Sequence, residues 1–162
     1  MSMEIKELLD TIPQIGTLDW IGIRPSRVEP MEVLESVEVC LENGLVGDRF
    51  QGDPGAKRQV TLIQKEHLPA IQSILQCDPI DPATVRRNLL VSGINLQSLK
   101  QKTFSIGEVV LKGTGNCPPC SKMETVLGPG GYNAMRGHGG LTATVVKPGT
   151  IKLGDEVKFV SG

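Results

Sequence analysis

The sequence predicts a mainly β protein whose sheet closes into a barrel, or is at least strongly curved, with a few short helices. Its 19 glycines and 11 prolines are spread along all 162 residues instead of collecting in one linker, so the secondary-structure elements must be short. Several segments alternate apolar and polar residues as strands do, and only two or three segments are helical in pattern. Closing the sheet removes the exposed edges that many short strands would otherwise leave.

The first half of the chain combines a short helix, three strand-like segments and a longer helix. MEIKELL, residues 3–9, predicts a short amphipathic helix, and QIGTLDWIGIRP predicts a strand that ends at Pro25. VLESVEVCLE alternates apolar and polar residues and stops at an Asn-Gly pair, which is a hairpin turn signal. QVTLI, residues 59–63, predicts a strand that runs into the helical segment QKEHLPAIQSIL, whose Pro69 lies near the first turn, where proline is tolerated.

The second half predicts further strands, separated by glycine or proline turns. The glycine-dense segment GPGGYNAMRGHGG, residues 128–140, predicts a flexible lid. We expect residues 1–15 to form an N-terminal extension with a short helix and residues 16–162 to form a single barrel domain, because the chain is long enough for one core but short for two. The strand-like segments of this half are residues 86–93, 104–115, 142–151 and 155–160.

The composition argues against nucleic acid and membranes as partners. Lys and Arg number 17 against 18 Asp and Glu, a net charge of -1, so no overall field attracts a polyanion. The five aromatic residues are few for stacking on bases. The N-terminus lacks the pattern of a secretory signal, and no apolar run is long enough to span a bilayer. We therefore expect a cytoplasmic protein with its four cysteines reduced.

The segment GTGNCPPCSKME carries the strongest chemical signal, Cys117 and Cys120. One C-x-x-C supplies only two of the four ligands of a structural zinc site, and the other cysteines and histidines are scattered singles. Thioredoxin-type chemistry needs a βαβ context, whereas this pattern is mostly β. Ser121 and Glu124 predict a capping box, which would place Cys120 just before a helix, where partial positive charge favours a thiolate. A buried structural cysteine explains these features equally well.

Two other segments offer groups that bind anions. Guanidinium groups pair with phosphate or carboxylate in a two-pronged geometry. The first segment is GLVGDRFQG, with Asp48 and Arg49 on a glycine-flanked turn, and the second is RRN, with Arg86, Arg87 and Asn88. An ion pair that stabilises the turn explains the residues of the first segment equally well, and a solvated basic edge explains those of the second.

Several segments together resemble the MOSC domain family, which is named for the C-terminal domain of molybdenum cofactor sulfurases. They are, in order, GLVGDRF, KRQVTLIQKEHL, VRRNLLVSGINLQSLKQKTFSIGEVVL, CPPC and RGHGGLTATVVKPGTIKLGDEV. The resemblance runs from about Gly16 to the C-terminus. It implies a β-barrel like the barrel domain of pyruvate kinase, which agrees with the strand pattern.

The resemblance also implies a site. Its single functional cysteine falls on Cys120, which would carry sulfur as a persulfide or ligate the molybdenum of a bound molybdenum cofactor (molybdopterin). Cys117 would resolve a persulfide on Cys120 or be incidental. The positions implied for holding the anionic pterin or organising the pocket are Asp48, Arg49, Arg86, Arg87 and Asn88, and more weakly Arg136 and His138.

Three functions are compatible with this site. We expect carriage or transfer of sulfur first, because no electron-transfer domain is attached. The alternatives are a cofactor-dependent reductase of N-hydroxylated compounds and a non-enzymatic module that binds an anionic, pterin-like ligand. A pyridoxal-phosphate desulfurase domain has no room in 162 residues, so we expect a cysteine desulfurase or a molybdoenzyme as partner.

Overall fold

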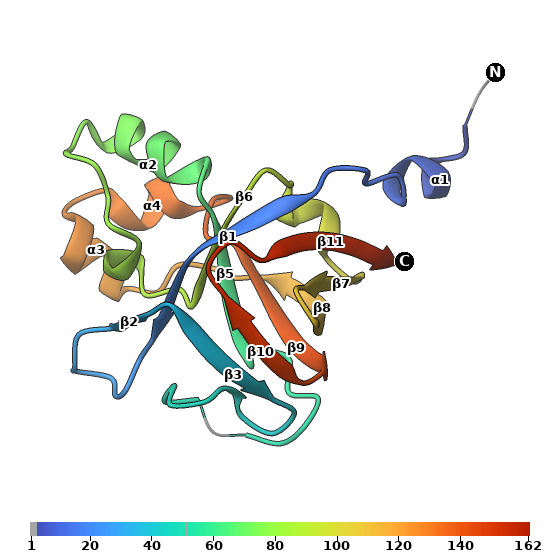
Figure 1. The fold of residues 1–162 in the computed structure, drawn as a ribbon. Coiled ribbons are helices and arrows are strands. Elements are labelled where there is room, and N and C mark those ends of the chain that lie inside the picture. The colour runs from blue at the N-terminus through green and yellow to red at the C-terminus, as the bar shows by residue number, and fades with distance from the viewer. Residues whose placement is uncertain (1–2, 51) are drawn as a thin grey trace.

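The computed structural model describes residues 3–50 and 52–162, and most of its strands form one sheet that closes on itself (Figure 1). The strands of this sheet are β1 (Gly16–Ile23), β2 (Glu32–Leu34), β5 (Val60–Gln64), β6 (Leu89–Ser92), β7 (Thr103–Ile106), β8 (Val109–Asn116), β9 (Leu141–Lys147) and β11 (Glu156–Ser161). Their order is β11-β7-β8-β9-β5-β6-β1-β2, and a further pairing of β11 with β1 closes a barrel of seven strands. Only β5 and β6 pair in parallel. The predicted class, a mainly β protein with a closed barrel, is confirmed.

A smaller sheet of three strands lies beside the barrel, in the order β10 (Gly149–Lys152), β3 (Ser36–Cys40) and β4 (Gly44–Leu45). It exists because the predicted strand VLESVEVCLE divides at Glu35, so that β2 pairs with β1 while β3 pairs with β10 and β4. The Asn-Gly turn joins β3 to β4, as predicted. Gly44 there has φ of +74°, and a Cβ would lie 2.5 Å from the Gln59 carbonyl oxygen.

Two other predicted strands also divide. Residues 104–115 become β7 and β8, which form a hairpin around Gly107 at φ of +56°. Residues 142–151 become β9 and β10 on either side of Pro148, which has no N–H to continue the ladder. Each division falls on the residue type that breaks a strand.

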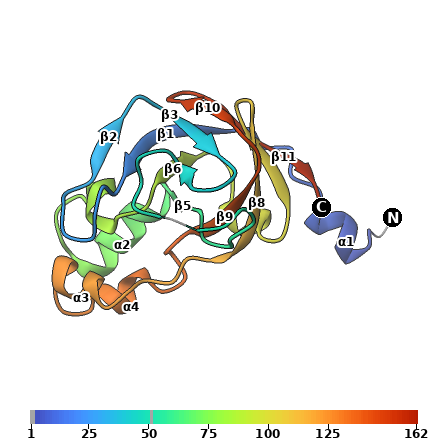
Figure 2. The same cartoon turned by 90° about the horizontal axis from the view of Figure 1, so that it is seen from below.

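Three α-helices gather on one side of the barrel, namely α2 (His67–Leu75), α3 (Lys122–Leu127) and α4 (Gly131–Met135), as Figures 1 and 2 show. α1 (Ile5–Leu9) lies apart from them, beside the C-terminus, and buries none of its residues. Two 3-10 turns, η1 (Pro82–Val85) and η2 (Leu96–Leu99), complete the helical elements that the structure describes. None of the helices in residues 3–50 and 52–162 has both the length and the apolar character needed to span a bilayer.

The glycine-dense segment 128–140 is not an open lid. Its middle forms α4, and the side chains of Ala134 and Met135 are buried in a cluster with Leu68 and Ile71 of α2. The prediction was wrong because glycine density alone does not reveal an apolar pair that packs against another helix.

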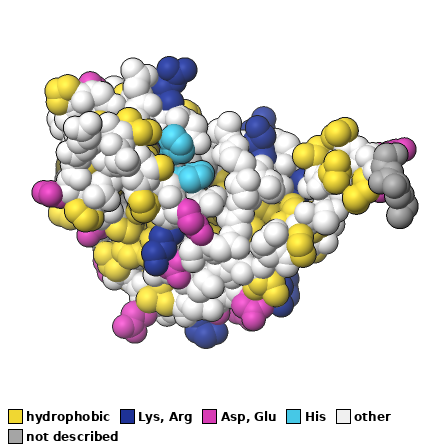
Figure 3. All heavy atoms as spheres, turned by 90° about the horizontal axis from the view of Figure 1, so that it is seen from above, with side chains coloured by type: hydrophobic (Ala, Val, Ile, Leu, Met, Phe, Trp, Pro, Cys, Tyr) yellow, Lys and Arg dark blue, Asp and Glu magenta, His cyan; other side chains and the backbone are white. Residues whose placement is uncertain are grey.

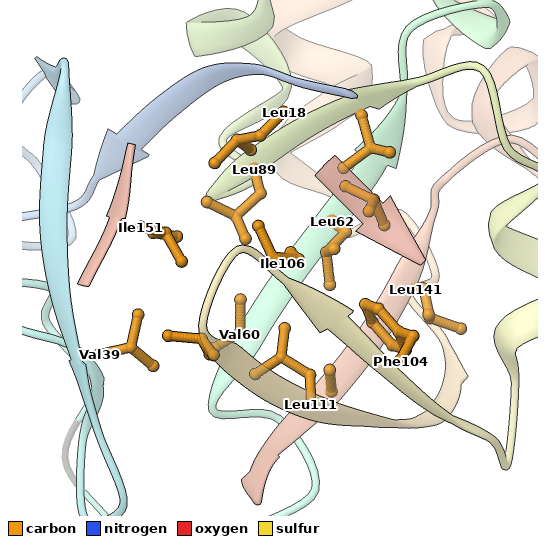
Figure 4. Packing of buried hydrophobic residues seen from close by; sticks show 14 of the residues in the cluster. Leu18, Val39, Val60, Leu62, Leu89, Phe104, Ile106, Leu111, Leu141 and Ile151 are labelled. Atoms are coloured by element: carbon orange, nitrogen blue, oxygen red, sulfur yellow. The ribbon is translucent and has the colours of Figure 1, made fainter. Parts of the chain in front are cut away.

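The barrel interior is a continuous apolar core. Side chains such as Leu62, Leu89 and Phe104 point inward and have no exposed surface (Figure 4). The next residues along β5 and β6, Ile63 and Leu90, point outward and pack beneath α2 and α4 in a second cluster. Both faces of these strands are therefore covered, which explains their unbroken apolar runs. Each fully buried side chain of this kind contributes about 1.5–3 kcal/mol.

Candidate functional site

A cavity of about 440 Å³ opens at one edge of the barrel, and its wall is strongly basic. Six of the seven arginines in the chain line it, and so does Lys122. Cys120 lies in the same wall, and no Asp or Glu is among the described residues that line the cavity. The arginines are Arg24, Arg27, Arg49, Arg58, Arg86 and Arg87, and the remaining lining residues are Val28, Val85, Ser121 and Met123.

The register of three strands explains how these arginines meet. Leu89 of β6 lies opposite Ile21 of β1 on one side and Leu62 of β5 on the other. β1 is antiparallel to β6, and β5 is parallel to it, so the end of β1 meets the beginnings of β5 and β6. Arg24 follows β1, whereas Arg58 precedes β5 and residues 86–87 precede β6. One edge of the sheet thus collects basic residues from three separate segments.

Asp48 lies behind this wall and balances one of its charges. Its carboxylate accepts bonds from the guanidinium of Arg24 at 3.0 and 3.2 Å and from the Arg24 backbone N–H at 2.7 Å. The Asp48 side chain is fully buried, and that of Arg24 is 12% exposed. Burial by itself would raise the pKa of Asp48, but the hydrogen bonds and charge of Arg24 outweigh burial and lower this pKa. The predicted ion pair is therefore made with Arg24 and not with its neighbour Arg49.

Asn88 is a structural residue that joins three segments. Its side-chain oxygen accepts from the N–H and hydroxyl of Thr61, both at 3.1 Å, and its amide nitrogen donates to the Gly22 carbonyl and to Asp48. Asn88 is fully buried, so no ligand in the cavity can reach it without displacing these bonds. Asp48 and Asn88 therefore support the wall of the cavity from behind.

Arg86 and Arg87 are held by backbone carbonyl groups. Arg86 has φ of +56° and donates to the carbonyls of Ser26 and Glu29. Burial, and then the like charges of Arg24 and Arg49, lower the pKa of Arg86, which shows how closely the cations are crowded. Arg87 is only 5% exposed, and burial is also the main influence that lowers its pKa.

Arg87 fastens the cysteine segment to the glycine-dense segment. Its Nε donates to the Gly139 carbonyl at 2.9 Å, and a terminal nitrogen donates to the carbonyl of Pro118 at 3.3 Å and that of Cys117 at 3.4 Å. Gly139 must be glycine here, because a Cβ would lie 2.2 Å from the Cys117 carbonyl oxygen. The position of the loop that carries Cys120 therefore depends on Arg87.

Three arginines of the cavity are exposed and unengaged. The side chains of Arg27, Arg49 and Arg58 donate no hydrogen bond and form no ion pair within the described part of the chain, and all three are solvent-exposed. Lys122, in contrast, donates to the backbone carbonyl of Arg27 at 3.0 Å. The unengaged guanidinium groups can therefore turn toward an anion without breaking an interaction in the fold.

The two cysteines have different environments. Cys120 is exposed in the basic cavity. Cys117 is 1% exposed, and its backbone N–H donates to the Gly140 carbonyl at 2.9 Å. Cys117 lines another cavity, of about 250 Å³, together with Pro118 and Pro119. An anion in the basic cavity would meet Cys120 and not Cys117.

The predicted capping box does not form. Ser121 precedes α3 but makes no side-chain cap, and Glu124 instead accepts the N–H groups of Gly130 and Tyr132 at the beginning of α4. These two backbone bonds lower the pKa of Glu124. Since α3 has only six residues, the positive charge around Cys120 comes mainly from the guanidinium groups.

Arg136 and His138 do not line the basic cavity. Arg136 donates to the Asn133 side chain at 3.3 Å and lines the 250 Å³ cavity. His138 packs against His67, and burial followed by the charge of His138 lowers the pKa of His67. The structure thus brings Arg49, Arg86, Arg87 and Cys120 together and leaves these two residues outside.

Sequence reasoning missed four residues of the wall, namely Arg24, Arg27, Arg58 and Lys122. Arg24 and Arg58 lie just outside a strand, Arg58 directly after Lys57, and a solvated strand end is the ordinary interpretation of such charges. A search for arginines within three residues of a predicted strand end would have found Arg24, Arg27 and Arg58. Lys122 carries no such signal.

Comparison with known proteins identifies the fold and the family. The model of the MOSC domain matches residues 47–158, more than half of the chain. The crystal structure of YuaD from Bacillus subtilis superposes with a TM-score of 0.80 at 20% identity, covering 94% of this chain and 100% of that one. The crystal structure of YiiM from Geobacillus stearothermophilus has a TM-score of 0.73 at 14% identity, covering 90% of this chain and 75% of that one. The crystal structure of YiiM from Escherichia coli has a TM-score of 0.69 at 18% identity, covering 90% of this chain and 70% of that one.

At these identities the three structures establish the barrel fold alone. Among curated protein sequences, none matches this chain significantly. The family assignment therefore rests on the domain model, which includes both cysteines and four of the six cavity arginines. This chain belongs to the MOSC domain family, which is associated with functions related to the molybdenum cofactor.

Proposed function

We propose that the basic cavity binds the molybdenum cofactor by its anionic end and that Cys120 is the thiol that carries sulfur to it. One observation supports this most: the exposed Cys120 shares a cavity with six arginines and with no acidic residue among those described. Clustered guanidinium groups in a concave site attract and orient a phosphate-bearing ligand.

The residues present fit such a ligand. A volume of about 440 Å³ lies within the range of roughly 300–1,000 Å³ that is usual for small-molecule sites. Arg27, Arg49 and Arg58 would hold the phosphate, while Arg86 and Arg87 add charge from fixed positions. When bound, the cofactor would supply a molybdenum centre, for which a soft thiolate is a suitable partner.

The sulfur step needs only an exposed thiolate and a donor. The Cys120 thiolate attacks the terminal sulfur of a persulfide on a partner protein of the cysteine desulfurase class, and a new S–S bond forms at Cys120 Sγ. The donor's S–S bond breaks, and the donor cysteine leaves as a thiolate with the electron pair, so no external oxidant is required. The exposure of Cys120 permits this approach, whereas the burial of Cys117 hinders it.

Cofactor binding is tested by expression in a host that makes the cofactor, anaerobic purification, and measurement of molybdenum and pterin. We expect both in the wild type and a loss of pterin in the Arg49→Gln/Arg58→Gln double variant. Arg136→Gln is the matched control, because Arg136 lies outside the cavity. Equal pterin content in all three proteins would contradict this part of the proposal.

Sulfur carriage is tested separately with a cysteine desulfurase and cysteine labelled with radioactive sulfur. We expect the label on the wild type and on Cys77→Ala, whose thiol is exposed outside the cavity, and none on Cys120→Ala. Label that survives in Cys120→Ala would overturn the assignment. Molybdenum that is lost in Cys120→Ala, without label on the wild type, would favour a reductase with Cys120 as a metal ligand.

A further inference from the structure

The only two histidines of the chain meet on its surface. His67 begins α2 and His138 follows α4, and their ring centroids lie 5.3 Å apart with an angle of 75° between the planes. Both side chains are half-buried. Figure 3 shows them as two adjoining cyan side chains, open to solvent from above. The two histidines lie far apart in the sequence and share no motif, so only the fold brings them together.

The spacing of the rings suits a shared metal ion. Two imidazoles on one tetrahedral zinc, with Zn–N bonds of about 2.0–2.1 Å, place their centroids roughly 5 Å apart. The observed distance of 5.3 Å between the ring centroids lies close to this separation. An edge-to-face aromatic contact explains the same distance without a metal. The hydrogen bonds of the rings are therefore needed to show whether their nitrogens are available to a metal.

The hydrogen bond of His138 leaves the other ring nitrogen available. Its Nδ1 lies 3.2 Å from the carbonyl oxygen of Ala134, which can only accept. In the neutral ring the proton is therefore on Nδ1, and Nε2 presents a lone pair. Histidine ligands of metals in proteins are usually oriented in this way, by a bond from the second nitrogen to a carbonyl or carboxylate. His67 makes no ring hydrogen bond to the residues that the structure describes, so its nitrogens are available too.

We propose that His67 and His138 form a surface site for a divalent transition metal of the zinc class, with Nε2 of His138 as one ligand. Imidazole nitrogen suits Zn²⁺, Cu²⁺ and Ni²⁺ and not Mg²⁺ or Ca²⁺. No third His, Cys, Asp or Glu completes a cluster within residues 3–50 and 52–162. The remaining positions of the metal are therefore taken by water or by an external ligand.

The site joins two elements that pack against each other through apolar side chains such as Leu68, Ile71 and Met135. α2 carries His67, and the segment after α4 carries His138. The next residue, Gly139, gives its carbonyl to Arg87, which fastens the loop of Cys120. A metal at the histidine pair would therefore restrain the segment on which Arg87 depends. The proposal itself does not rest on the function assigned to the basic cavity.

Titration calorimetry of the full chain with zinc chloride tests the site. Because the exposed thiols of Cys77 and Cys120 also bind zinc, the experiment uses a background in which both are serine. We expect one ion per chain, no heat with magnesium chloride, and an affinity at least tenfold weaker in both His67→Asn and His138→Asn. Unchanged affinity in either variant, or no binding to the background protein, would overturn the proposal.

A second measurement keeps the proposal falsifiable if a histidine variant fails to fold. Ring ¹⁵N spectra of the background protein report each imidazole nitrogen. Zinc should move the Nε2 resonance of His138 and leave Nδ1 protonated. A proton on Nε2, or a resonance that zinc does not move, would establish an aromatic contact without a metal site.

Discussion

The barrel interior and the basic cavity follow opposite physical rules. The interior consists mostly of strand residues, which are apolar and buried, and each stabilises the fold by leaving water. The cavity consists of residues beyond the strand ends, and it gathers positive charges that repel one another. The first region supplies stability, and the second contributes little to it. A structure that maintains such a concentration of like charge is suited to an anion that neutralises it.

A few polar residues share the burial of the interior and support the cavity. Asp48, Asn88 and Arg87 are buried, yet each positions a part of the cavity wall. Substitutions can therefore be sorted by whether they change stability, anion binding or both. Inorganic pyrophosphate serves as the probe of anion binding in the experiments that follow.

The largest effect on stability is expected from Phe104→Ala in the interior. Phe104 has no exposed surface, and its removal leaves a cavity in the core that should destabilise the protein by about 3–5 kcal/mol. Urea unfolding measures this loss. Pyrophosphate affinity of the folded variant should stay within about twofold of wild type; a much larger change would mean that the two regions are not separable.

Asp48→Asn should change both the stability of the fold and the binding of anions, because Asp48 is buried and also supports the cavity wall. It removes the partner of the Arg24 charge, and we expect a loss of roughly 3 kcal/mol, at the lower end for a buried ion pair since Arg24 keeps some solvent contact. The freed charge of Arg24 should also strengthen pyrophosphate binding. Calorimetry and urea unfolding of the same protein test both effects, and a stable variant with unchanged binding would contradict the role given to Asp48.

The same carboxylate makes stability depend on pH. Although burial opposes ionisation, Arg24 lowers the pKa of Asp48 below its usual value. The ionised group therefore stabilises the fold above the unfolded pKa of about 3.9, and this contribution is lost as the pH falls through the lower folded pKa. Urea unfolding at pH values from 6 downward should show a steeper acid loss in wild type than in Asp48→Asn. Parallel curves would contradict this.

Gly139→Ala should have an intermediate effect on stability and a clear effect on the site. Its Cβ would press on the backbone of Cys117, which cannot move as a flexible side chain would, so we expect a loss of about 1–3 kcal/mol. The loop of Cys120 should shift, and the reaction rate of its thiol with a disulfide reagent should change. Gly115→Ala is the control, because its nearest contact would be an ordinary 3.9 Å. Equal behaviour of both variants would contradict the tight contact at Gly139.

Arg58→Gln should have the smallest effect on stability and still weaken binding. Its side chain is exposed and unengaged among the described residues, so unfolding should change by less than about 0.5 kcal/mol. A charged hydrogen bond to an anion is worth about 1.5 kcal/mol or more, so pyrophosphate affinity should fall roughly tenfold. Arg136→Gln, outside the cavity, should leave the affinity unchanged. An equal loss in both variants would indicate a diffuse surface effect.

Much of the fold could be predicted from local patterns. The run QVTLI gave β5, and the helical segment after it gave α2 with Pro69 in its first turn. The division at Glu35 was missed because alternation continues across it, and those at Gly107 and Pro148 were missed although each is a residue type that breaks a strand. The capping box was wrong because Glu124 bonds to the beginning of α4, a partner that no local pattern contains.

The site was predicted only in part. The family resemblance pointed to Cys120 and to Arg49, Arg86 and Arg87, which line one cavity. It also pointed to Arg136 and His138, which lie elsewhere, since neighbours of a glycine-dense segment are placed by its path and not by their spacing. Arg24 and Arg58 were missed because a charged residue at the end of a strand is ordinarily solvated, and neither belongs to a motif that indicates a site.

The sequence by itself determined the type of the strands and of the helices α1 and α2, because alternation and apolar runs act over a few residues. Leu62 and Leu89 could be assigned to predicted strands without a structure, but the face on which each lies could not, because both faces of these strands are apolar. Only the tertiary structure decided which charges meet, because the pairing of β1, β5 and β6 sets which strand ends share an edge. That pairing depends on contacts between distant segments, and so the basic cavity and the histidine pair became visible only in the folded chain.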